Sequence, residues 1–474
     1  MNLMIYERIK ELSSMGEIVA GDQKERKLIS KFEKMFSNID DRKIVPIEVL
    51  NYSSETYMEG EKKIEAISLP YSPDIDFDGK IVRDFKSCNN SGILIILDNL
   101  YDINKFYIKA LENQCQFIVF TLDNNLRKYV VKTPPFLNLS ASIPPPIPAF
   151  YIRKNDLDYI REKISIKNLT KIKRTTGYIF EIIKNAKKDD KIYVSAHHDH
   201  WFTGEHDNLA SLALFPEIES SIYELHLITF TAEEAGALGY SSFSWSFGSR
   251  YYLDNVVKNL DNIILNINLD NINPFSPVVK ISPGLFTLST KYFNVKREIE
   301  IYSDGYSFFK KGIPSLTIEG INPNYHSDND TVNKDEEKGF YDILHKINTI
   351  LNTEIVIDNL EIKENLVNIM ENLPLPLRVN LVNITNNTFL DKKPTSIYKL
   401  YGGIYNFQER YAKVKPFPLI LGLDSVRANT SKVFIEGKPS MELRPVDKEY
   451  YAHLMEQFID YYINSIHELS KDIL

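Results

Sequence analysis

The chain has 474 residues, of which 43% are hydrophobic and 25% are charged, and its formal net charge is −8 at pH 7. A chain of this length has room for two or three domains with a large buried core. No basic stretch is large enough to dominate the electrostatic field, so the composition argues against nucleic acid or an anionic membrane as the main partner.

The first residues and the cysteines bear on the compartment. Residues 1–17 carry scattered charges without an apolar core of signal-peptide length, and nowhere do about 18 apolar residues follow one another. We therefore expect a cytoplasmic protein that does not span a membrane. Cys88 and Cys115 are the only cysteines, and we expect two free, partly buried thiols in a chain of this size.

The N-terminal region, residues 1–61, predicts two helices and a strand. Apolar side chains follow one another at helical spacing between residues 6 and 36, and Gly16 and Gly21 interrupt the pattern. Residues 43–50 then predict a strand. We assign this region to the main domain of the protein.

Residues 62–166 consist of short β-rich runs, unlike the regions on either side, and predict a separate β-rich module, which we call the insert. Short β-rich runs cover residues 79–82, 92–97 and 117–122. The prolines of SIPPPIPAF lack amide donors and have a fixed φ, which favours an exposed, extended connection.

Residues 167–373 predict the rest of the main domain, with an α/β fold. Four apolar, β-branched segments alternate with helical segments between about residues 171 and 351; they read KIYVSA, ELHLITFT, NIILNINL and SLTI. Such alternation is typical of a mostly parallel sheet with helices on both faces and right-handed crossovers.

Residues 374–474 form a C-terminal extension of α+β character. It contains a GGIY turn, a few expected strands and an expected terminal helix from about residue 447, whose apolar residues recur at i+3/i+4 spacing. This stripe favours packing against the main domain, with a homo-oligomer interface as the alternative.

Potential metal ligands follow each strand of the predicted sheet. The segment KIYVSA ends at His197, the second strand leads to Glu233 and Glu234, the third ends at Asp270, and the fourth leads through a loop to His326. Open α/β sheets bind ligands at the carboxyl ends of their strands. Because imidazoles and carboxylates are zinc ligands, these positions predict a metal site.

Six segments carry a resemblance to a known family: AHHD (196–199), GEHDN (204–208), TAEEAGALG (231–239), NLDNI (268–272), SDGYSFFKKGIPSLTI (303–318) and YHSDNDT (325–331). In this order they resemble the motifs of the co-catalytic di-zinc aminopeptidases. That superfamily also contains glutamate carboxypeptidase-like enzymes, glutaminyl cyclases and transferrin-receptor ectodomains. The resemblance implies the three-layer, phosphorylase/hydrolase-like sheet of a zinc exopeptidase, with helices on both faces, and an insert similar to a protease-associated domain.

The resemblance also implies two zinc ions per chain and their ligands. His197 and Asp270 would hold one zinc, Glu234 and His326 would hold the other, and Asp207 would bridge them. Two zinc ions about 3.5–4 Å apart can lower the pKa of a shared water toward roughly 7 and polarise a substrate carbonyl.

Three further residues receive roles from the resemblance. Glu233 would act as general base and acid, passing a proton from water to the leaving amine. Asp199 would orient His197, because metal-bound histidines usually donate their other nitrogen to a carboxylate or carbonyl. Tyr325 would hydrogen-bond the developing oxyanion. Asp330 is a candidate partner for His326.

The remaining polar residues near these motifs match no ligand position. We expect His198, His200 and His206 to be exposed or to lie behind the ligands, with the substrate entrance as an alternative for His200 and His206. His226 lies inside a strand and is expected to be a hydrogen-bonded core residue. Asp304 is expected to be a turn or cap residue.

We therefore predict a zinc-dependent exopeptidase, foremost an aminopeptidase that acts on peptide substrates through a metal-bridged hydroxide. The alternatives are a glutaminyl-cyclase-like acyl transferase with one zinc, a carboxypeptidase of acidic peptides, and a non-catalytic binding homologue. A carboxypeptidase of acidic peptides would need arginines over the site, and the candidates are Arg250, Arg297, Arg378 and Arg410. Ser211 and Gly305 depart from the family pattern, in which Gly and His are common, and this bears on substrate preference.

Overall fold

The computed structural model describes residues 4–369 except 38, 40, 132–144, 186–187, 239–244 and 301, and also residues 379, 382–383, 432–435 and 438–442. Within the C-terminal extension, β15 (Lys432–Ile435) and β16 (Lys438–Glu442) form an antiparallel hairpin. The expected terminal helix lies outside the described residues. Among the helices that are described, none has the length and apolar character needed to cross a bilayer.

The predicted N-terminal helices are α1 (Ile5–Ser13) and α2 (Gln23–Met35). Each buries one apolar face, and α2 begins at Asp22, whose carboxylate accepts a hydrogen bond from the main-chain N–H of Lys24. The strand predicted at residues 43–50 is longer than expected. It is β1 (Arg42–Glu59), which pairs antiparallel with β8 (Lys163–Lys184) along its whole length.

The main domain is built on one sheet in which the strands follow the order β13-β12-β14-β11-β9-β10-β8. Its central strands are mutually parallel, as predicted: β9 (Lys191–His197), β10 (Glu224–Phe230), β11 (Ile263–Leu269) and β14 (Ser315–Gly320). The sheet is mixed toward its edges, because β8 runs antiparallel to β10 and β12 (Pro277–Ile281) runs antiparallel to β14. The edge strand β13 (Val295–Lys296) is parallel to β12.

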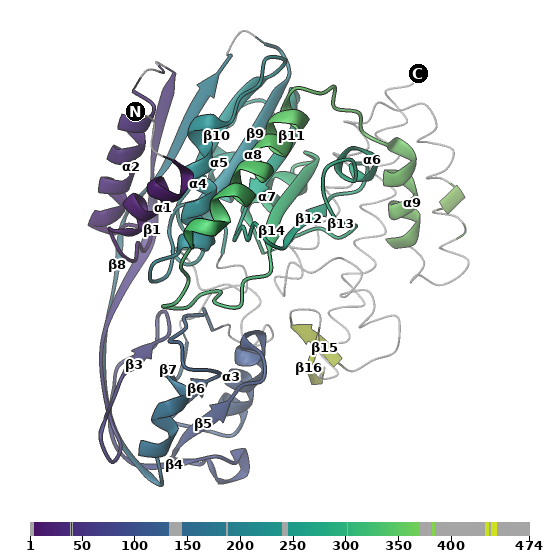
Figure 1. Ribbon diagram of the computed structural model, residues 1–474. Coiled ribbons are helices and arrows are strands. Elements are labelled where there is room, and N and C mark those ends of the chain that lie inside the picture. Colours follow the sequence, from purple (N-terminus) through teal and green to yellow (C-terminus); the bar gives the residue numbers. More distant parts are fainter. Residues whose placement is uncertain are drawn as a thin grey trace.

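Helices cover both faces of this sheet (Figure 1). In β10, Leu225 and Leu227 pack with α1, α2 and two further helices, whereas Ile228 and Phe230 pack on the opposite face. This alternation follows from the period of two along a strand. The first face carries α4 (Ala210–Leu214) and α8 (Glu337–Leu351), and the second carries α5 (Phe247–Asn255) and α7 (Asp304–Lys310). The short α6 (Phe286–Ser289) and α9 (Asn359–Ile369) lie near β12 and β13.

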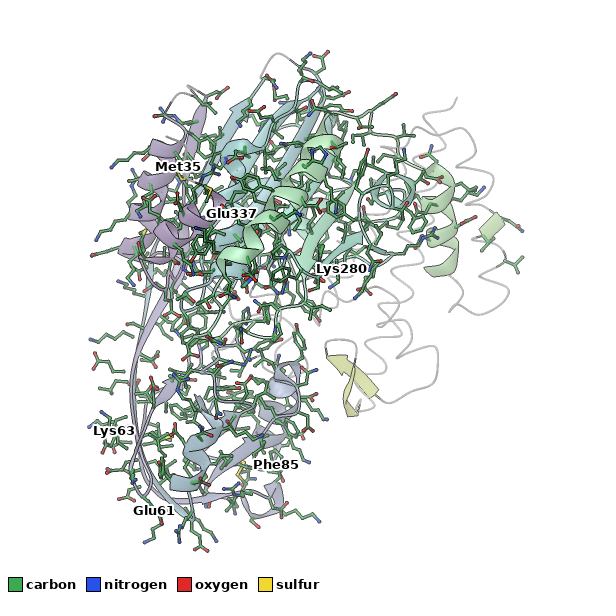
Figure 2. All side chains as sticks on the ribbon, in the orientation of Figure 1. Met35, Glu61, Lys63, Phe85, Lys280 and Glu337 are labelled. Atoms are coloured by element: carbon green, nitrogen blue, oxygen red, sulfur yellow. A yellow bond between two sulfur atoms is a disulfide. The ribbon has the colours of Figure 1, made fainter. Side chains whose placement is uncertain are left out.

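The insert is a small α/β unit with a core of its own. Its strands are β2 (Lys63–Ile64), β3 (Ala66–Ser68), β4 (Ile75–Val82), β5 (Gly92–Ile96), β6 (Phe117–Thr121) and β7 (Ala149–Ile152), and its helix is α3 (Ile103–Glu112). Side chains fill both this unit and the main domain (Figure 2), and each of the two has buried apolar clusters. The insert is not joined by a linker, because β1 and β8 continue into it and β8 pairs with β4 (Figure 1).

The expectation of two free thiols is wrong, because Cys88 and Cys115 form a disulfide across 27 residues of chain. Each cysteine lies shortly before a strand of the insert, β5 or β6. These strands are parallel neighbours with Gly92 opposite Phe117, so their amino ends bring the two sulfur atoms together. The pairing therefore depends on the order of strands, which the spacing of two cysteines does not reveal.

Reduction of this disulfide is expected to destabilise the insert by about 3–4 kcal/mol, because a loop of this length is constrained in the unfolded chain. Thermal unfolding with and without reductant measures the effect. A variant with both Cys88 and Cys115 changed to alanine should unfold at the lower temperature and should not respond to reductant. Equal unfolding temperatures for oxidised and reduced wild-type protein would contradict the prediction.

Candidate metal centre

The carboxyl ends of neighbouring parallel strands bring the predicted ligands together. His197 is the last residue of β9, Asp270 follows β11 directly, Glu234 follows β10, and His326 lies in the loop after β14. These strands are adjacent in the order β14-β11-β9-β10, so their ends meet at one edge of the sheet. Asp207 reaches the same place from the turn before α4, where its peptide bond to Asn208 is cis.

The ligand atoms form two groups that share Asp207. In one group, His197 Nε2 lies 3.2 Å from Asp207 Oδ1 and 3.5 Å from Asp270 Oδ1. In the other, His326 Nε2 lies 3.0 Å from Glu234 Oε1 and 3.4 Å from Asp207 Oδ2. Each oxygen of Asp207 therefore faces a different imidazole, which is the arrangement expected of a bridging carboxylate.

These residues fit zinc ions. Asp207 Oδ2, Glu234 Oε1 and His326 Nε2 are buried and have no hydrogen-bond partner, although they face one another. Ligands about 2.0–2.1 Å from a tetrahedral zinc lie roughly 3.3 Å from each other. The separations of 3.0 to 3.5 Å between imidazole and carboxylate atoms match that geometry.

Main-chain carbonyls orient both imidazoles. His197 Nδ1 lies 2.8 Å from the carbonyl oxygen of Asp199, and His326 Nδ1 lies 3.1 Å from that of Lys128 in the insert. A carbonyl oxygen can only accept, so each Nδ1 carries a proton and each Nε2 is directed to the ligand group. The partner expected for His326, Asp330, is therefore wrong.

Asp199 also acts through different atoms from those expected. Its carboxylate does not orient His197 and instead accepts hydrogen bonds from the main-chain N–H groups of Glu233 and Glu234, each at 3.1 Å. The carboxylate thus fixes the turn that presents the two adjacent glutamates, while the carbonyl group of the same residue holds the imidazole.

Asp330 and His206 lie behind the bridging carboxylate. Asp330 accepts a hydrogen bond from the main-chain N–H of Asp207 at 3.1 Å and pairs with His206 Nδ1 at 2.8 Å. Glu336 pairs with the other nitrogen of His206 at 2.7 Å. Burial opposes the charged imidazole, but the two carboxylates raise the pKa of His206 to about 9.

Four further histidines, His198, His200, His206 and His226, are buried. His200 and His206 are both buried, so the alternative that they line the substrate entrance is wrong. His198 is buried between Thr229 and Glu25. His226 is a hydrogen-bonded core residue, as predicted.

Glu233 lies buried next to the two ligand groups. Burial raises its pKa well above the ordinary value, against the opposing charge of His197. Ser246 Oγ donates a hydrogen bond to Glu233 Oε1 at 2.7 Å, and the main-chain N–H of Ser246 donates to the carbonyl oxygen of Glu233 at 2.8 Å. No sequence pattern points to Ser246, because it lies 13 residues from its partner and in no strand.

Tyr325 and Asp304 complete the surroundings of the site. The Tyr325 ring stacks on the His326 imidazole, with ring centroids 3.7 Å apart. Asp304 is the first residue of α7 and not its cap, which is Ser303; Asp304 is buried, and burial raises its pKa to about 7. Gly305 packs so closely that an added Cβ would lie 2.8 Å from Thr317 Oγ1. A larger residue at that position would have to displace its neighbours.

Two of the candidate arginines are described. Arg250 donates to the carbonyl oxygens of Trp245 and Ser246, and the guanidinium of Arg297 lies 3.6 Å from the centre of the Phe286 ring. Arg378 and Arg410 lie outside the described residues.

Zinc binding is expected to release protons. Burial raises the pKa of Glu234 to about 7, and Glu234 raises that of His326 to about 10 although burial opposes the charged imidazole. Zinc must replace these protons, so its apparent affinity should fall as the pH drops below 7, where both groups are protonated. Calorimetry at pH 7 in buffers of different ionisation enthalpy should show that zinc binding releases protons. A binding enthalpy that is the same in every buffer would contradict this.

The comparison with known families agrees with this geometry. Residues 179–349 match peptidase family M28. We call this matched part of the chain the M28 domain. The M28 domain contains every residue of the two ligand groups, together with Glu233 and Tyr325. A search of curated proteins finds no match.

Solved structures show the same fold. A zinc aminopeptidase from Bacillus subtilis is 18% identical, with a TM-score of 0.55, and covers 74% of this chain and 95% of its own. A peptidase M28 precursor from Shewanella amazonensis SB2B is 15% identical, with a TM-score of 0.62, and covers 75% and 94%. An aminopeptidase from Aneurinibacillus sp. strain AM-1 is 20% identical, with a TM-score of 0.50, and covers 75% and 95%. At these identities the likeness shows the fold alone.

Proposed function

We propose that the protein is a zinc-dependent aminopeptidase that binds two zinc ions and releases N-terminal residues from peptides. One observation carries the proposal: two groups of metal-ligand atoms share the carboxylate of Asp207, and Glu233 is buried beside them. The match to peptidase family M28 and the fold shared with a zinc aminopeptidase support it.

The residues of the site divide the chemistry between them. When bound, two zinc ions supply Lewis acidity and lower the pKa of water. Glu233 accepts the proton of the attacking water and returns it to the leaving amine. Ser246 holds Glu233 Oε1 in place, which leaves Oε2 for the proton. Burial raises the pKa of Tyr325 well above its ordinary value, so its hydroxyl stays protonated and can donate to the developing oxyanion.

Peptides with blocked ends test the proposal. The zinc-loaded protein should release N-terminal residues from unblocked peptides and aminoacyl anilides, and acetylation of the peptide N-terminus should abolish release. Cleavage of acetylated peptides at an acidic C-terminus would instead identify a carboxypeptidase. One zinc per chain together with cyclisation of N-terminal glutamine would identify a glutaminyl-cyclase-like enzyme. If the protein binds two zinc ions but turns over none of these substrates, it would be identified as a non-catalytic binding homologue.

The compartment and the oligomeric state stay predictions. A cytoplasmic location predicts that Cys88 and Cys115 are reduced in the cell, whereas disulfides persist in oxidising compartments. The disulfide between them therefore weighs against the cytoplasm. Alkylation of thiols during cell lysis, followed by mass spectrometry, distinguishes reduced cysteines from a disulfide. An oligomer formed through residues 374–474 would appear as a change in mass, measured by light scattering, when this region is removed.

A further inference from the structure

A short segment of the insert lies beside the metal-binding loop of the M28 domain. The main-chain N–H of Lys128 donates to the carbonyl oxygen of His326 at 3.0 Å, and the N–H of Asp328 donates to the carbonyl oxygen of Leu126 at 3.0 Å. Arg127 and Ser327 are opposite each other in this antiparallel bridge. The insert therefore pairs with the loop at the metal ligand His326 itself and just after it in the chain.

Arg127 fastens the same loop with its side chain. Its Nη1 donates to the carbonyl oxygen of Tyr325 at 2.6 Å, and its Nη2 donates to that of Pro323 at 2.8 Å. Asp123 of the insert balances the charge, with an oxygen 2.6 Å from Nη2. Arg127 is only 3% exposed, so the planar guanidinium is held in one orientation and spans two carbonyl groups that a point donor could not reach together.

The backbone of His326 needs such support. Its φ of +58° lies in the left-handed region, which costs free energy for a residue with a Cβ. The carbonyl oxygen of Lys128 accepts from His326 Nδ1 and thereby directs Nε2 toward Glu234 and Asp207. The insert thus supports both the backbone and the ring of this ligand.

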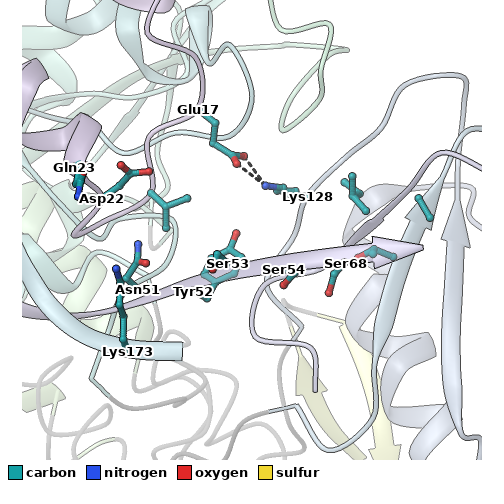
Figure 3. Close-up of a pocket in the computed structure, with 14 residues that line it drawn as sticks. Glu17, Asp22, Gln23, Asn51, Tyr52, Ser53, Ser54, Ser68, Lys128 and Lys173 are labelled. Atoms are coloured by element: carbon teal, nitrogen blue, oxygen red, sulfur yellow. Dashed lines mark hydrogen bonds and ion pairs between the residues drawn. The ribbon is translucent and has the colours of Figure 1, made fainter. Parts of the chain in front are cut away.

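Lys128 ties the insert to a third part of the chain. Its ammonium group pairs with Glu17 at 2.6 Å, on the wall of a cavity of about 500 Å³ (Figure 3). Glu17 also accepts a hydrogen bond from the main-chain N–H of Phe202 at 3.2 Å. The position of the Lys128 carbonyl group is therefore fixed from the N-terminal region as well as from the insert.

The other histidine ligand does not depend on the insert in this way. The ring of His197 is oriented by the carbonyl group of Asp199, two residues along its own chain, and His197 itself ends a central strand. The two ligand groups thus differ in origin. The group of His197 and Asp270 is built within the M28 domain, and the group of Glu234 and His326 is completed from outside it.

We propose that Arg127 is a positioning residue of the metal centre, through which the insert sets the affinity of one zinc site, that of Glu234 and His326. The inference rests on the zinc centre of the proposed function. Arg127 touches neither the metal nor the substrate in this role and acts through the loop that carries His326. The insert is accordingly part of the catalytic unit.

Zinc affinities of three variants of the full chain test the proposal, measured by competition with a chromophoric chelator. In Arg127→Ala, one zinc should bind about 10–100-fold more weakly, the loss typical when a residue that orients a metal ligand is removed, and the other should bind as in wild type. Arg127→Lys keeps the positive charge next to Asp123 but lacks the planar guanidinium that spans two carbonyl groups. It should show a smaller loss of zinc affinity at the same site. Arg161→Gln is the matched control, because Arg161 also belongs to the insert and forms an exposed ion pair with Glu61, just outside it.

A positioning role differs from a merely structural one in two measurements. The turnover of Arg127→Ala should return toward the wild-type value as zinc is raised, and the visible spectrum of the cobalt-substituted protein should change for one ion only. Unchanged affinities in Arg127→Ala, or equal weakening of both zinc ions, would overturn the proposal. If Arg127→Ala does not fold, Arg127→Lys decides by the same criteria. A wild-type protein that binds no zinc would instead overturn the proposed function.

Discussion

Replacement of Glu233 by glutamine is expected to lower kcat about 10²–10⁴-fold while both zinc ions remain bound, because general acid and base catalysis contributes roughly this factor. Glutamine keeps the size of the side chain and can still accept from Ser246 Oγ, which lies 2.7 Å from Glu233 Oε1. It cannot carry the proton from water to the leaving amine. Steady-state kinetics together with zinc analysis measure the two parts of this expectation.

The neighbouring glutamate is the matched control. Glu234 Oε1 faces His326 Nε2 at 3.0 Å, so Glu234→Gln should weaken one zinc ion, and its activity should recover as zinc is added. Added zinc should not restore Glu233→Gln. If the two variants lose the same amount of metal, the roles of the adjacent glutamates have been assigned wrongly.

Replacement of Asp207 by asparagine is expected to weaken both zinc ions together, each by more than about 100-fold, which exceeds the usual effect of changing a residue behind a ligand. Asp207 gives one oxygen to each ligand group, with His197 at 3.2 Å and His326 at 3.4 Å. Asparagine has one oxygen and no charge, so it cannot serve two cations. Equilibrium dialysis against zinc measures both affinities, and activity at ordinary zinc concentrations should be lost.

A surface aspartate provides the control for this change. Asp342 forms an exposed ion pair with Lys346 on α8, and Asp342→Asn should bind zinc as wild type does. Loss of only one zinc ion in Asp207→Asn would mean that the carboxylate does not bridge. Comparison of two variants distinguishes the roles of their residues. Arg127→Ala should weaken the binding of one zinc ion, whereas Asp207→Asn should weaken the binding of both.

Four of the five candidate ligands could be proposed from the sequence because each follows a recognisable strand. The β-branched runs ending at His197 and before Asp270 predicted buried parallel strands, and strands of that kind place their carboxyl ends at one edge of a sheet. The family resemblance added Asp207, which lies in a turn and follows no strand. Glu233 and Glu234 were proposed both because they follow a predicted strand and because of the family resemblance. The structure places the five candidate ligands in two groups.

The partners of these residues could not be predicted in the same way. The carbonyl group that orients His326 belongs to Lys128, 198 residues away, and any residue type has a carbonyl group. Asp330 was the nearer choice in sequence, but it is committed to His206 and to the N–H of Asp207. A main-chain acceptor cannot be recognised from residue types, so it becomes visible only when the insert packs on the loop that carries His326.

The sequence by itself thus determined the α/β architecture and the residue types that meet at the candidate site, because hydrophobic period and residue type are local properties of the chain. The tertiary structure decided which atoms hold the ligands in place, that Cys88 and Cys115 are bonded, and that Arg127 of the insert supports a metal-binding loop. Each of these depends on contacts between segments far apart in the chain. Such contacts form only when the order of strands in the sheet is fixed, and no local pattern encodes that order.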